Sequence, residues 1–225
     1  MSADQELARL LEHPAIWRGR SAARRETLPT GFGALNERLP GRGWPRTGLI
    51  EILVPRFGIG ELSLLLPALA SLTRGAAARW CVWVAPPANL FAPALEAHGL
   101  RLDRVLVVRA ESRSPAARGA KSGRRAPVPL SIWACEQTLG SGACDAVLNW
   151  TRHRETKALR RLQLAAERGR TLGVLFRPAH LAEESSPAIL RLLLAPSTRG
   201  VLVTLLKSRG GVRGSVEIEL RSKGN

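Results

Sequence analysis

Short apolar runs alternate along the chain with segments whose apolar residues recur at helical spacing. The runs predicted as strands are Leu49–Val54, Trp80–Val84, Val105–Val108, Ala146–Trp150, Thr171–Phe176 and Val201–Leu206. The segments predicted as helices are Glu61–Thr73, Ala92–His98, Ser131–Leu139, Thr156–Glu167 and Pro187–Leu194. Since the strands are apolar on both faces, this alternation predicts an α/β fold with a mostly parallel sheet covered by helices.

Two local features refine this picture. The glycine pair Gly210 and Gly211 predicts a turn into a last strand near Ser215–Leu220, paired as an antiparallel hairpin at one edge of the sheet. The helix predicted over Glu61–Thr73 is leucine-rich nearly all round, so we expect it to be buried centrally. Pro67 lies inside that helix and predicts a kink or a local irregularity.

Changes in composition divide the chain into an arm, a core and a tail. Residues 1–27 have leucines at helical spacing followed by arginines, which predicts an N-terminal helical arm with a basic linker. Residues 28–220 hold the alternating elements and are predicted to form one core. Within it, residues 111–129 lack a hydrophobic period and predict a flexible basic loop. Residues 221–225 are predicted to be a disordered tail.

Composition bounds the class of protein. The chain has 225 residues, of which 45% are hydrophobic, enough for one large globular domain. Lys and Arg number 34 against 18 Asp and Glu, a net charge of +16. That imbalance favours a polyanionic partner, most often nucleic acid, with arginine enrichment from codon usage as the alternative.

Other classes find no support in the sequence. The three cysteines are too scattered for a disulfide framework or a zinc site, and the histidines have no ligand spacing, so we expect no metal and no cofactor. The N-terminus opens with acidic residues instead of a basic and apolar leader. No apolar run approaches the roughly 18 residues of a membrane-spanning helix. The expected protein is soluble and cytoplasmic, with no membrane partner.

The stretch EILVPRFGIGELS, from Glu51 to Ser63, has the strand–turn–helix layout of a phosphate-binding loop. In such a loop, glycines let backbone N–H groups point at a phosphate, a lysine neutralises the β- and γ-oxygens, and a hydroxyl holds Mg²⁺. Pro55, Gly58 and Gly60 keep this layout, but Glu61 replaces the lysine and Leu62 replaces the hydroxyl residue. A carboxylate at this point repels phosphate, so the loop predicts no nucleotide binding and no ATP turnover.

Residues 28–206 resemble a RecA-type core, on the stretches TGFGALNERLPGRGWPRTGLIEIL, RWCVWVAPPANLFAPALEAHGLRLDRVLVV and WACEQTLGSGACDAVLNW. The resemblance implies a P-loop NTPase fold whose catalytic glutamate would fall at Pro86. Its metal-linked aspartate would fall at Trp150, or at Asn149 with a slip of one residue. Three catalytic elements are therefore absent together, which predicts a pseudo-ATPase with no catalytic residues.

Within that superfamily the chain resembles the ImuA family, on LPTGFGALNERLPGRGWP, GIGELSLLLPALA, WVAPP, RLQLAAERGRTLGVLFRP and SSPAILRLLL. The resemblance implies a non-catalytic adaptor in damage-induced (SOS) error-prone translesion DNA synthesis. It implies four partners, namely DNA without sequence preference, an ImuB-type polymerase-like protein, an error-prone DnaE-type polymerase and RecA itself. The alternative is the related SulA family of cell-division inhibitors, which would bind FtsZ. The length ahead of the loop and the basic balance favour ImuA.

Basic residues mark the candidate surfaces for DNA or a protein partner. They lie on the predicted basic loop, on one stripe of the helix Thr156–Glu167 with its lead-in, and on the final hairpin. The candidates are Arg113, Arg118, Lys121, Arg124, Arg125, Arg154, Lys157, Arg161, Arg168, Lys207, Arg209 and Arg213. For the helix stripe, an ordinary solvated face is the alternative.

Four tryptophans fall within predicted elements. Trp80, Trp83 and Trp150 lie on strands and Trp133 on an apolar helix, so we expect them in the core and not stacked on bases. For Trp17 and Trp44, the sequence does not decide between core packing and base stacking.

Overall fold

The structure is a computed structural model that describes residues 26–109, 128–208 and 214–220. The predicted arm (except for its last two residues), nearly all of the predicted basic loop, and the tail lie outside the described residues, so the predicted division of the chain stays a prediction.

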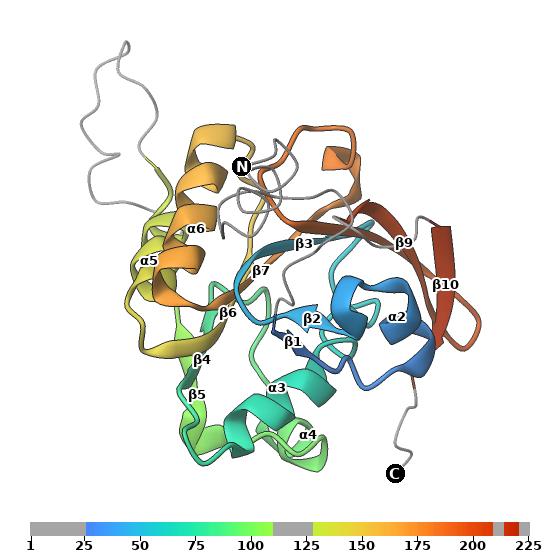
Figure 1. Cartoon of the computed structure of the whole chain (residues 1–225), viewed down its shortest axis with the longest axis horizontal. Coiled ribbons are helices and arrows are strands. Elements are labelled where there is room, and N and C mark those ends of the chain that lie inside the picture. Colours follow the sequence, from blue (N-terminus) through green and yellow to red (C-terminus); the bar gives the residue numbers. More distant parts are fainter. Residues whose placement is uncertain (1–25, 110–127, 209–213, 221–225) are drawn as a thin grey trace, which may run out of the picture.

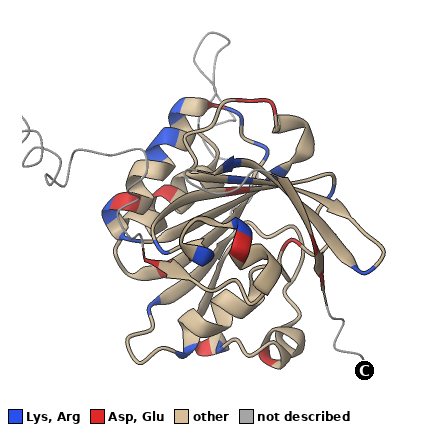
Figure 2. Cartoon of the chain, turned by 45° about the vertical axis from the view of Figure 1, so that its right-hand side comes forward, with Lys and Arg blue, Asp and Glu red and all other residues tan. Residues whose placement is uncertain are grey.

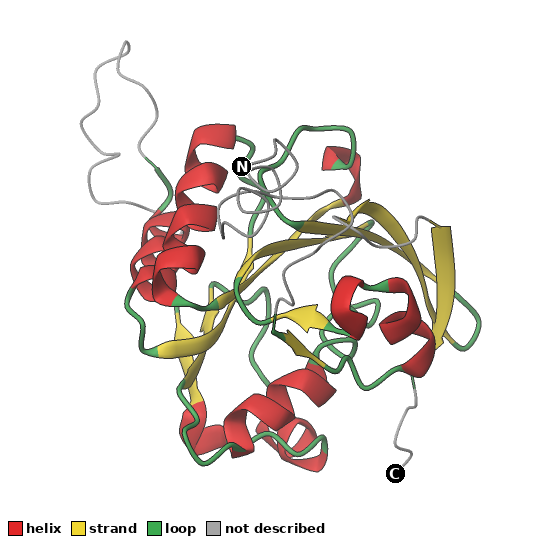
Figure 3. Cartoon of the chain, in the orientation of Figure 1, coloured by secondary structure: helices red, strands yellow, loops and turns green. Residues whose placement is uncertain are grey.

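Eight strands form one mixed, mostly parallel sheet, which confirms the predicted α/β class (Figures 1 and 3). The strand order is β10-β9-β8-β3-β7-β6-β4-β5. The strands are β3 (Gly48–Val54), β4 (Trp80–Val84), β5 (Val105–Val108), β6 (Cys144–Trp150), β7 (Leu172–Pro178), β8 (Leu190–Pro196), β9 (Gly200–Ser208) and β10 (Gly214–Glu219). The strands from β8 to β5 in this order run parallel. β9 and β10 form the predicted antiparallel hairpin at one edge. A separate two-stranded antiparallel ribbon joins β1 (Thr27–Leu28) to β2 (Trp44–Pro45).

Helices cover both faces of the sheet (Figure 3). One face carries α2 (Gly33–Arg38), α3 (Leu66–Arg74) and α4 (Ala92–Ala97), and their leucines share a core with Ile50 and Ile52 of β3. The other face carries α5 (Leu130–Gly140) and α6 (Thr156–Gly169), which share a second core with Leu49. Short 3₁₀ turns lie at Pro40–Arg42, Leu102–Arg104 and Ala179–Leu181. Within the part of the chain that the structure describes, none of the helices combines the length and apolar composition needed to span a bilayer.

The predicted helix Pro187–Leu194 is wrong, because this segment contains the strand β8 in the interior of the sheet. Leu190, Leu192 and Leu194 are buried in one core, while Arg191 points to the opposite face. A run of leucines satisfies a period of 2 and a period of 3.6 equally well, so periodicity alone cannot separate a strand from a buried helix. Pairing with β3 and β9 decided between them.

The leucine-rich helix is shorter than predicted. Turns occupy residues 61–65, and α3 begins at Leu66 with Pro67 in its first turn. Proline is tolerated there because the first N–H groups of a helix have no partner within it. Pro67 therefore marks the start of a helix instead of a kink, and the expected central burial is confirmed by Leu64, Leu65 and Leu69.

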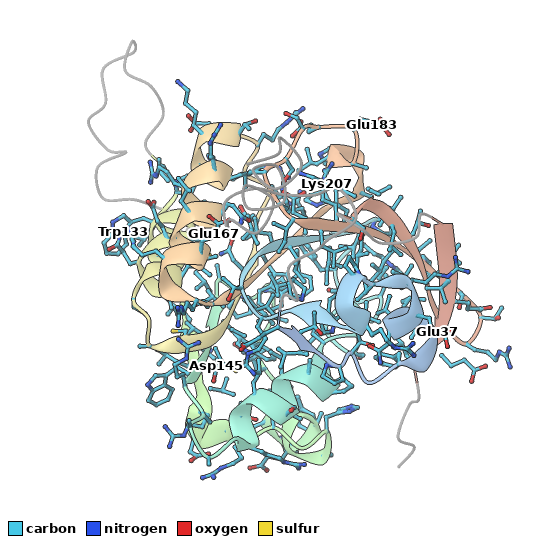
Figure 4. All side chains as sticks on the ribbon, in the orientation of Figure 1. Glu37, Trp133, Asp145, Glu167, Glu183 and Lys207 are labelled. Atoms are coloured by element: carbon cyan, nitrogen blue, oxygen red, sulfur yellow. The ribbon has the colours of Figure 1, made fainter. Side chains whose placement is uncertain are left out.

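The tryptophan prediction is half right. Trp83 and Trp150 are buried, and Trp150 stacks on Phe176 with ring centroids 4.7 Å apart. Trp80 and Trp133 are 40% and 53% exposed, so the expectation of burial is wrong for both. Trp80 is the first residue of β4, at the end of the sheet. Ile132, Cys135 and Leu139 form the buried side of α5. Trp133 projects from another side of the helix, away from the sheet (Figure 4).

Candidate functional site

The segment predicted as a degenerate phosphate loop follows β3 at the carboxyl edge of the sheet. Gly58 and Gly60 have φ values of 91° and 111°, in the region that favours glycine. A Cβ atom on Gly60 would lie 2.3 Å from the Cδ1 atom of Leu220, so the residue that follows β10 packs tightly over the loop. Gly58 and Gly60 therefore form a tight turn in which a larger residue at position 60 would clash with Leu220.

The carboxylate of Glu61 occupies the centre of this turn. Its Oε1 atom accepts a hydrogen bond from the backbone N–H of Gly58 at 2.7 Å, and its Oε2 atom accepts one from Ile59 at 2.9 Å. The residue is 4% exposed. Backbone N–H groups in such a turn are natural anion donors. Here two of them bind a carboxylate of the chain itself.

The two other positions at which the RecA resemblance places catalytic residues, Pro86 and Trp150, lie at the same edge. Pro86 follows β4, half-buried, beside a hollow of about 510 Å³ that Asn89, Val107 and Arg109 also line. Trp150 ends β6 and is buried against Phe176. Because parallel strands bring their carboxyl ends to one edge, the predicted positions do lie along a common rim. The side chains placed there offer neither a base nor a metal ligand.

Sequence analysis missed a buried ionic cluster around Glu51, on the middle of β3. Both Glu51 and Arg177 are fully buried, and Arg177 Nη1 donates to Glu51 Oε1 at 2.9 Å. Arg191 Nε donates to Oε2 at 2.7 Å, and the Ser186 hydroxyl donates to Oε1 at 2.6 Å. Two charged residues inside predicted apolar segments, Glu51 and Arg191, were the available signal, because charges in such positions are rarely unpaired.

Loops close around this cluster. Arg177 Nη2 donates to the carbonyl of His153 at 2.8 Å, and Arg191 donates to the carbonyls of Leu181 and Ala182 at 3.0 Å. Burial and the nearby Arg177 lower the pKa of His153. The guanidinium groups are thus engaged by β3 and by the segments that follow β6 and β7. We infer a structural role, since these contacts leave the carboxylate enclosed.

A second cluster of charged side chains lies at the amino edge of the sheet. It adjoins a hollow of about 580 Å³ whose lining includes Arg46, Arg79, Glu167 and Arg170. Arg79 Nε lies 3.1 Å from Asp145 Oδ1, and its other nitrogens donate to the carbonyls of Gly142 and Arg170 at 2.9 Å. The arginine thereby joins the turns that end α5 and α6. Asp145 and Glu167 are labelled in Figure 4.

The chain's thiols do not offer a nucleophile at neutral pH. Burial raises the pKa of Cys81 to about 12, and burial also raises the pKa of Cys135 and Cys144. Among the described residues no group of three or more potential ligands is placed to hold a metal ion.

Of the predicted basic binding residues, the structure describes Arg154, Lys157, Arg161, Arg168 and Lys207, and the other seven lie outside the described residues. Figure 2 shows basic residues along α6 and its lead-in. Most of the described ones make contacts within the chain. Arg154 Nε donates to Glu184 at 2.6 Å, and Arg161 Nε donates to Glu136 of α5 at 3.0 Å, which raises the pKa of Arg161.

The remaining three differ in their surroundings. The guanidinium of Arg168 lies against Gly140 at the end of α5. Lys207 Nζ donates to the carbonyl of Ser186 at 2.8 Å. Lys157 is exposed. Of the predicted stripe, Arg161 and Arg168 therefore contact α5, while Arg154 pairs with Glu184 and Lys157 is exposed.

Comparison with known proteins gives a consistent set of relatives, although no protein-family model matches the chain. The cell division inhibitor SulA of Photorhabdus laumondii is 32% identical over 125 residues, 56% of this chain and 61% of that protein. SulA of Pectobacterium atrosepticum is 31% identical over 123 residues, 54% of this chain and 63% of that protein. SulA of Edwardsiella piscicida is 32% identical over 136 residues, 60% of this chain and 70% of that protein.

The chain thus spans about three fifths of the length of the first two of these relatives. Among solved structures, SulA from Pseudomonas aeruginosa is 26% identical and is covered over 97% of its length, with 57% of this chain aligned. The TM-score of that superposition is 0.42, too low to carry a conclusion.

These relatives correct the expected function. All of them are named as cell division inhibitors, which contradicts the predicted role as a translesion-synthesis adaptor. The partners predicted for that role are therefore wrong as well. They were DNA, the ImuB-type protein, the DnaE-type polymerase and RecA. The SulA relation stated as the alternative is supported, and membership of the ImuA family is not. With 32% identity reaching across 70% of the Edwardsiella protein, the chain belongs to the SulA family of cell division inhibitors.

Proposed function

We propose that this protein inhibits cell division by binding FtsZ. The observation that carries the proposal is the 32% identity to SulA of Edwardsiella piscicida over 70% of that protein's length. The proposal combines the activity for which the relatives are named, inhibition of cell division, with the partner expected from the SulA resemblance, FtsZ. We also propose that the protein acts in the response to DNA damage (the SOS response).

The proposed action is by binding and involves no turnover of nucleotide, on a degenerate RecA-like core. The position of the Glu61 carboxylate, on the N–H groups of Gly58 and Ile59, supports this part of the proposal. A phosphate brought within about 4 Å of that carboxylate would meet a repulsion of at least about 1 kcal/mol, and more where water is excluded. Pro86 and Trp150 add no group that could assist hydrolysis.

The test is sedimentation of FtsZ filaments. Purified FtsZ is polymerised with GTP in the presence of increasing amounts of this protein, and the pelleted fraction is measured. We expect the pellet to shrink in proportion to added protein, because an inhibitor that works by binding acts stoichiometrically. Unchanged pellets with the protein in molar excess would contradict the proposal. Induced expression in dividing cells should produce filaments by the same reasoning.

The nucleotide part has its own test. Calorimetric titration with Mg-ATP should show no binding, and phosphate release should equal that of buffer. Binding or hydrolysis by the wild-type protein would overturn the pseudo-ATPase proposal while leaving the division-inhibitor proposal standing.

A further inference from the structure

The strand β5 forms one edge of the sheet and is apolar throughout (Figure 1). Its central residues Leu106 and Val107 are 48% and 38% exposed. Among the described residues, β4 is the strand that pairs with β5, and no other strand covers its outer side. Edge strands in soluble proteins are usually blunted by charges, prolines or bulges, because an open apolar edge pairs with other chains. The four residues Val105–Val108 contain none of these devices.

The opposite edge of the same sheet is blunted in the usual way. The strand β10 carries Ser215, Glu217 and Glu219 among its six residues, and Glu219 pairs with Arg199 at 3.0 Å. An apolar edge is therefore not a general property of this sheet. It distinguishes β5.

The backbone of β5 also offers hydrogen-bonding groups to a partner. The carbonyl of Val108 accepts a hydrogen bond from the N–H of Ala85, so the backbone of Val108 faces the β4 side. Backbone groups alternate in direction along a strand, so the N–H and C=O of Val107 face outward. Val107 thus presents one donor and one acceptor at the middle of the open edge.

Positive charge stands at both ends of this strand. Arg104 precedes it, and Arg109 follows it with one nitrogen donating to the Asn89 side chain at 2.9 Å. The nearby Asp103 is bound by Arg101, with 2.7 Å between Arg101 Nη2 and Asp103 Oδ2. The rim hollow lined by Val107 and Arg109 adjoins the strand.

The positive charges at both ends of β5 indicate which kind of chain would pair with this edge. A second copy of the chain pairing through β5, in either direction, would place arginine beside arginine, and like charges opposite each other weaken a strand pair. An extended segment with an apolar centre and carboxylates near its ends would instead match both the edge and the arginines. We propose that the outer edge of β5 receives such an acidic extended segment of a protein partner, by strand addition. The proposal does not depend on FtsZ being the partner.

The probe is a short peptide of alternating valine and threonine with two glutamates at each end, and the control peptide has lysines in place of the glutamates. Calorimetry should show saturable binding of the acidic peptide to the full-length protein and at least about tenfold weaker binding of the basic one, a difference of about 1.4 kcal/mol. Amide hydrogen exchange at Val107 should be fast in the free protein and slow when the acidic peptide is bound.

Variants locate the binding. Val107→Pro removes the outward N–H without touching the ladder to β4, and should weaken binding about tenfold or more. The matched variant Val107→Thr keeps the N–H and should bind nearly as the wild type does. The double variant Arg104→Glu, Arg109→Glu should reverse the preference between the two peptides.

Several outcomes would overturn the proposal. One is a Val107 amide that is already protected in the free protein, and another is equal binding of both peptides. Dimerisation that Val107→Pro abolishes would show that the edge serves a second copy. Displacement of the acidic peptide by a DNA oligonucleotide would show that the arginines serve nucleic acid.

Discussion

Two buried glutamates stand at the two ends of the segment that runs from β3 into the degenerate loop, and they are stabilised in different ways. Glu51 is held by two guanidinium groups and a hydroxyl that come from β7, β8 and the segment before β8. Glu61 is held by the backbone N–H groups of Gly58 and Ile59, within its own turn. One carboxylate is paired by the tertiary fold and the other by local chain geometry.

The comparison teaches what each loss would leave behind. Without Glu51, the buried Arg177 and Arg191 would face each other with no carboxylate between them. Without Glu61, two N–H groups would lose their acceptor at a turn where Gly58 is exposed, so water can replace it. The first loss should therefore cost far more than the second.

The largest expected effect is that of Glu51→Ala. Removing one partner from a buried ionic cluster typically costs about 3–5 kcal/mol, and we expect a loss of that size in the free energy of unfolding. Urea denaturation monitored by circular dichroism measures it. The matched control replaces Glu51, Arg177 and Arg191 together by Met, which should recover much of the loss. A single variant within 1 kcal/mol of wild type, on the order of a surface substitution, would refute the assigned importance of the cluster.

The second effect is that of Glu61→Ala. Loss of a side-chain acceptor for backbone N–H groups costs about 1–2 kcal/mol, by analogy with helix caps. The same denaturation experiment should place this variant clearly between wild type and Glu51→Ala. Glu61→Gln keeps an acceptor oxygen and should lie closer to wild type. Equal losses for Glu51→Ala and Glu61→Ala would erase the distinction drawn between the two carboxylates.

A smaller effect concerns pH and His153, whose carbonyl is bound by Arg177 in the Glu51 cluster. Its pKa is lowered in the folded protein, so as pH falls below about 6.5 the unfolded chain binds a proton that the folded chain still refuses. Stability should therefore decrease toward acid, because protonation of His153 favours the unfolded chain. His153→Gln should show a flatter profile between pH 7 and pH 5, on the order of the range where histidine titrates. An unchanged slope would exclude His153 as its source.

The smallest expected effect is that of Glu61→Lys on catalysis. The substitution restores a cation to the loop, but Pro86 and Trp150 still occupy the other catalytic positions, so we expect phosphate release to remain at the buffer level. A malachite-green assay with Mg-ATP measures this. Measurable hydrolysis by the variant would mean that the remainder of the site is more competent than its side chains indicate.

Sequence patterns located most of the sheet. The strands β4 and β5 have the predicted bounds, since both are bounded by clear breaks in hydrophobicity. The segment containing β8 was predicted as a helix, because leucine suits both structures and only its neighbours in the sheet distinguish them. The exposure of Trp133 could not be predicted either, because an apolar helix does not reveal which of its sides meets the sheet.

Within the candidate site, the two glutamates likewise differ in how far the sequence could predict their surroundings. The place of Glu61 in the turn could be predicted from the sequence, because the loop pattern fixes its position. Its hydrogen-bond partners lie only two and three residues away. The partners of Glu51 lie 126 and 140 residues away, at Arg177 and Arg191. No local pattern connects them.

What the sequence determined by itself was therefore the alternation of strands and helices, the glycine turn after β3 and the placement of an acidic residue, Glu61, in that turn. Each depends on residues that are neighbours along the chain, where propensity and spacing act directly. The tertiary structure alone decided that the leucine run of β8 is a strand, that Arg177 and Arg191 neutralise Glu51, and that β5 is the edge strand of the sheet among the described residues. These outcomes depend on which strands become neighbours in space, and that choice is made by the burial of the whole sheet.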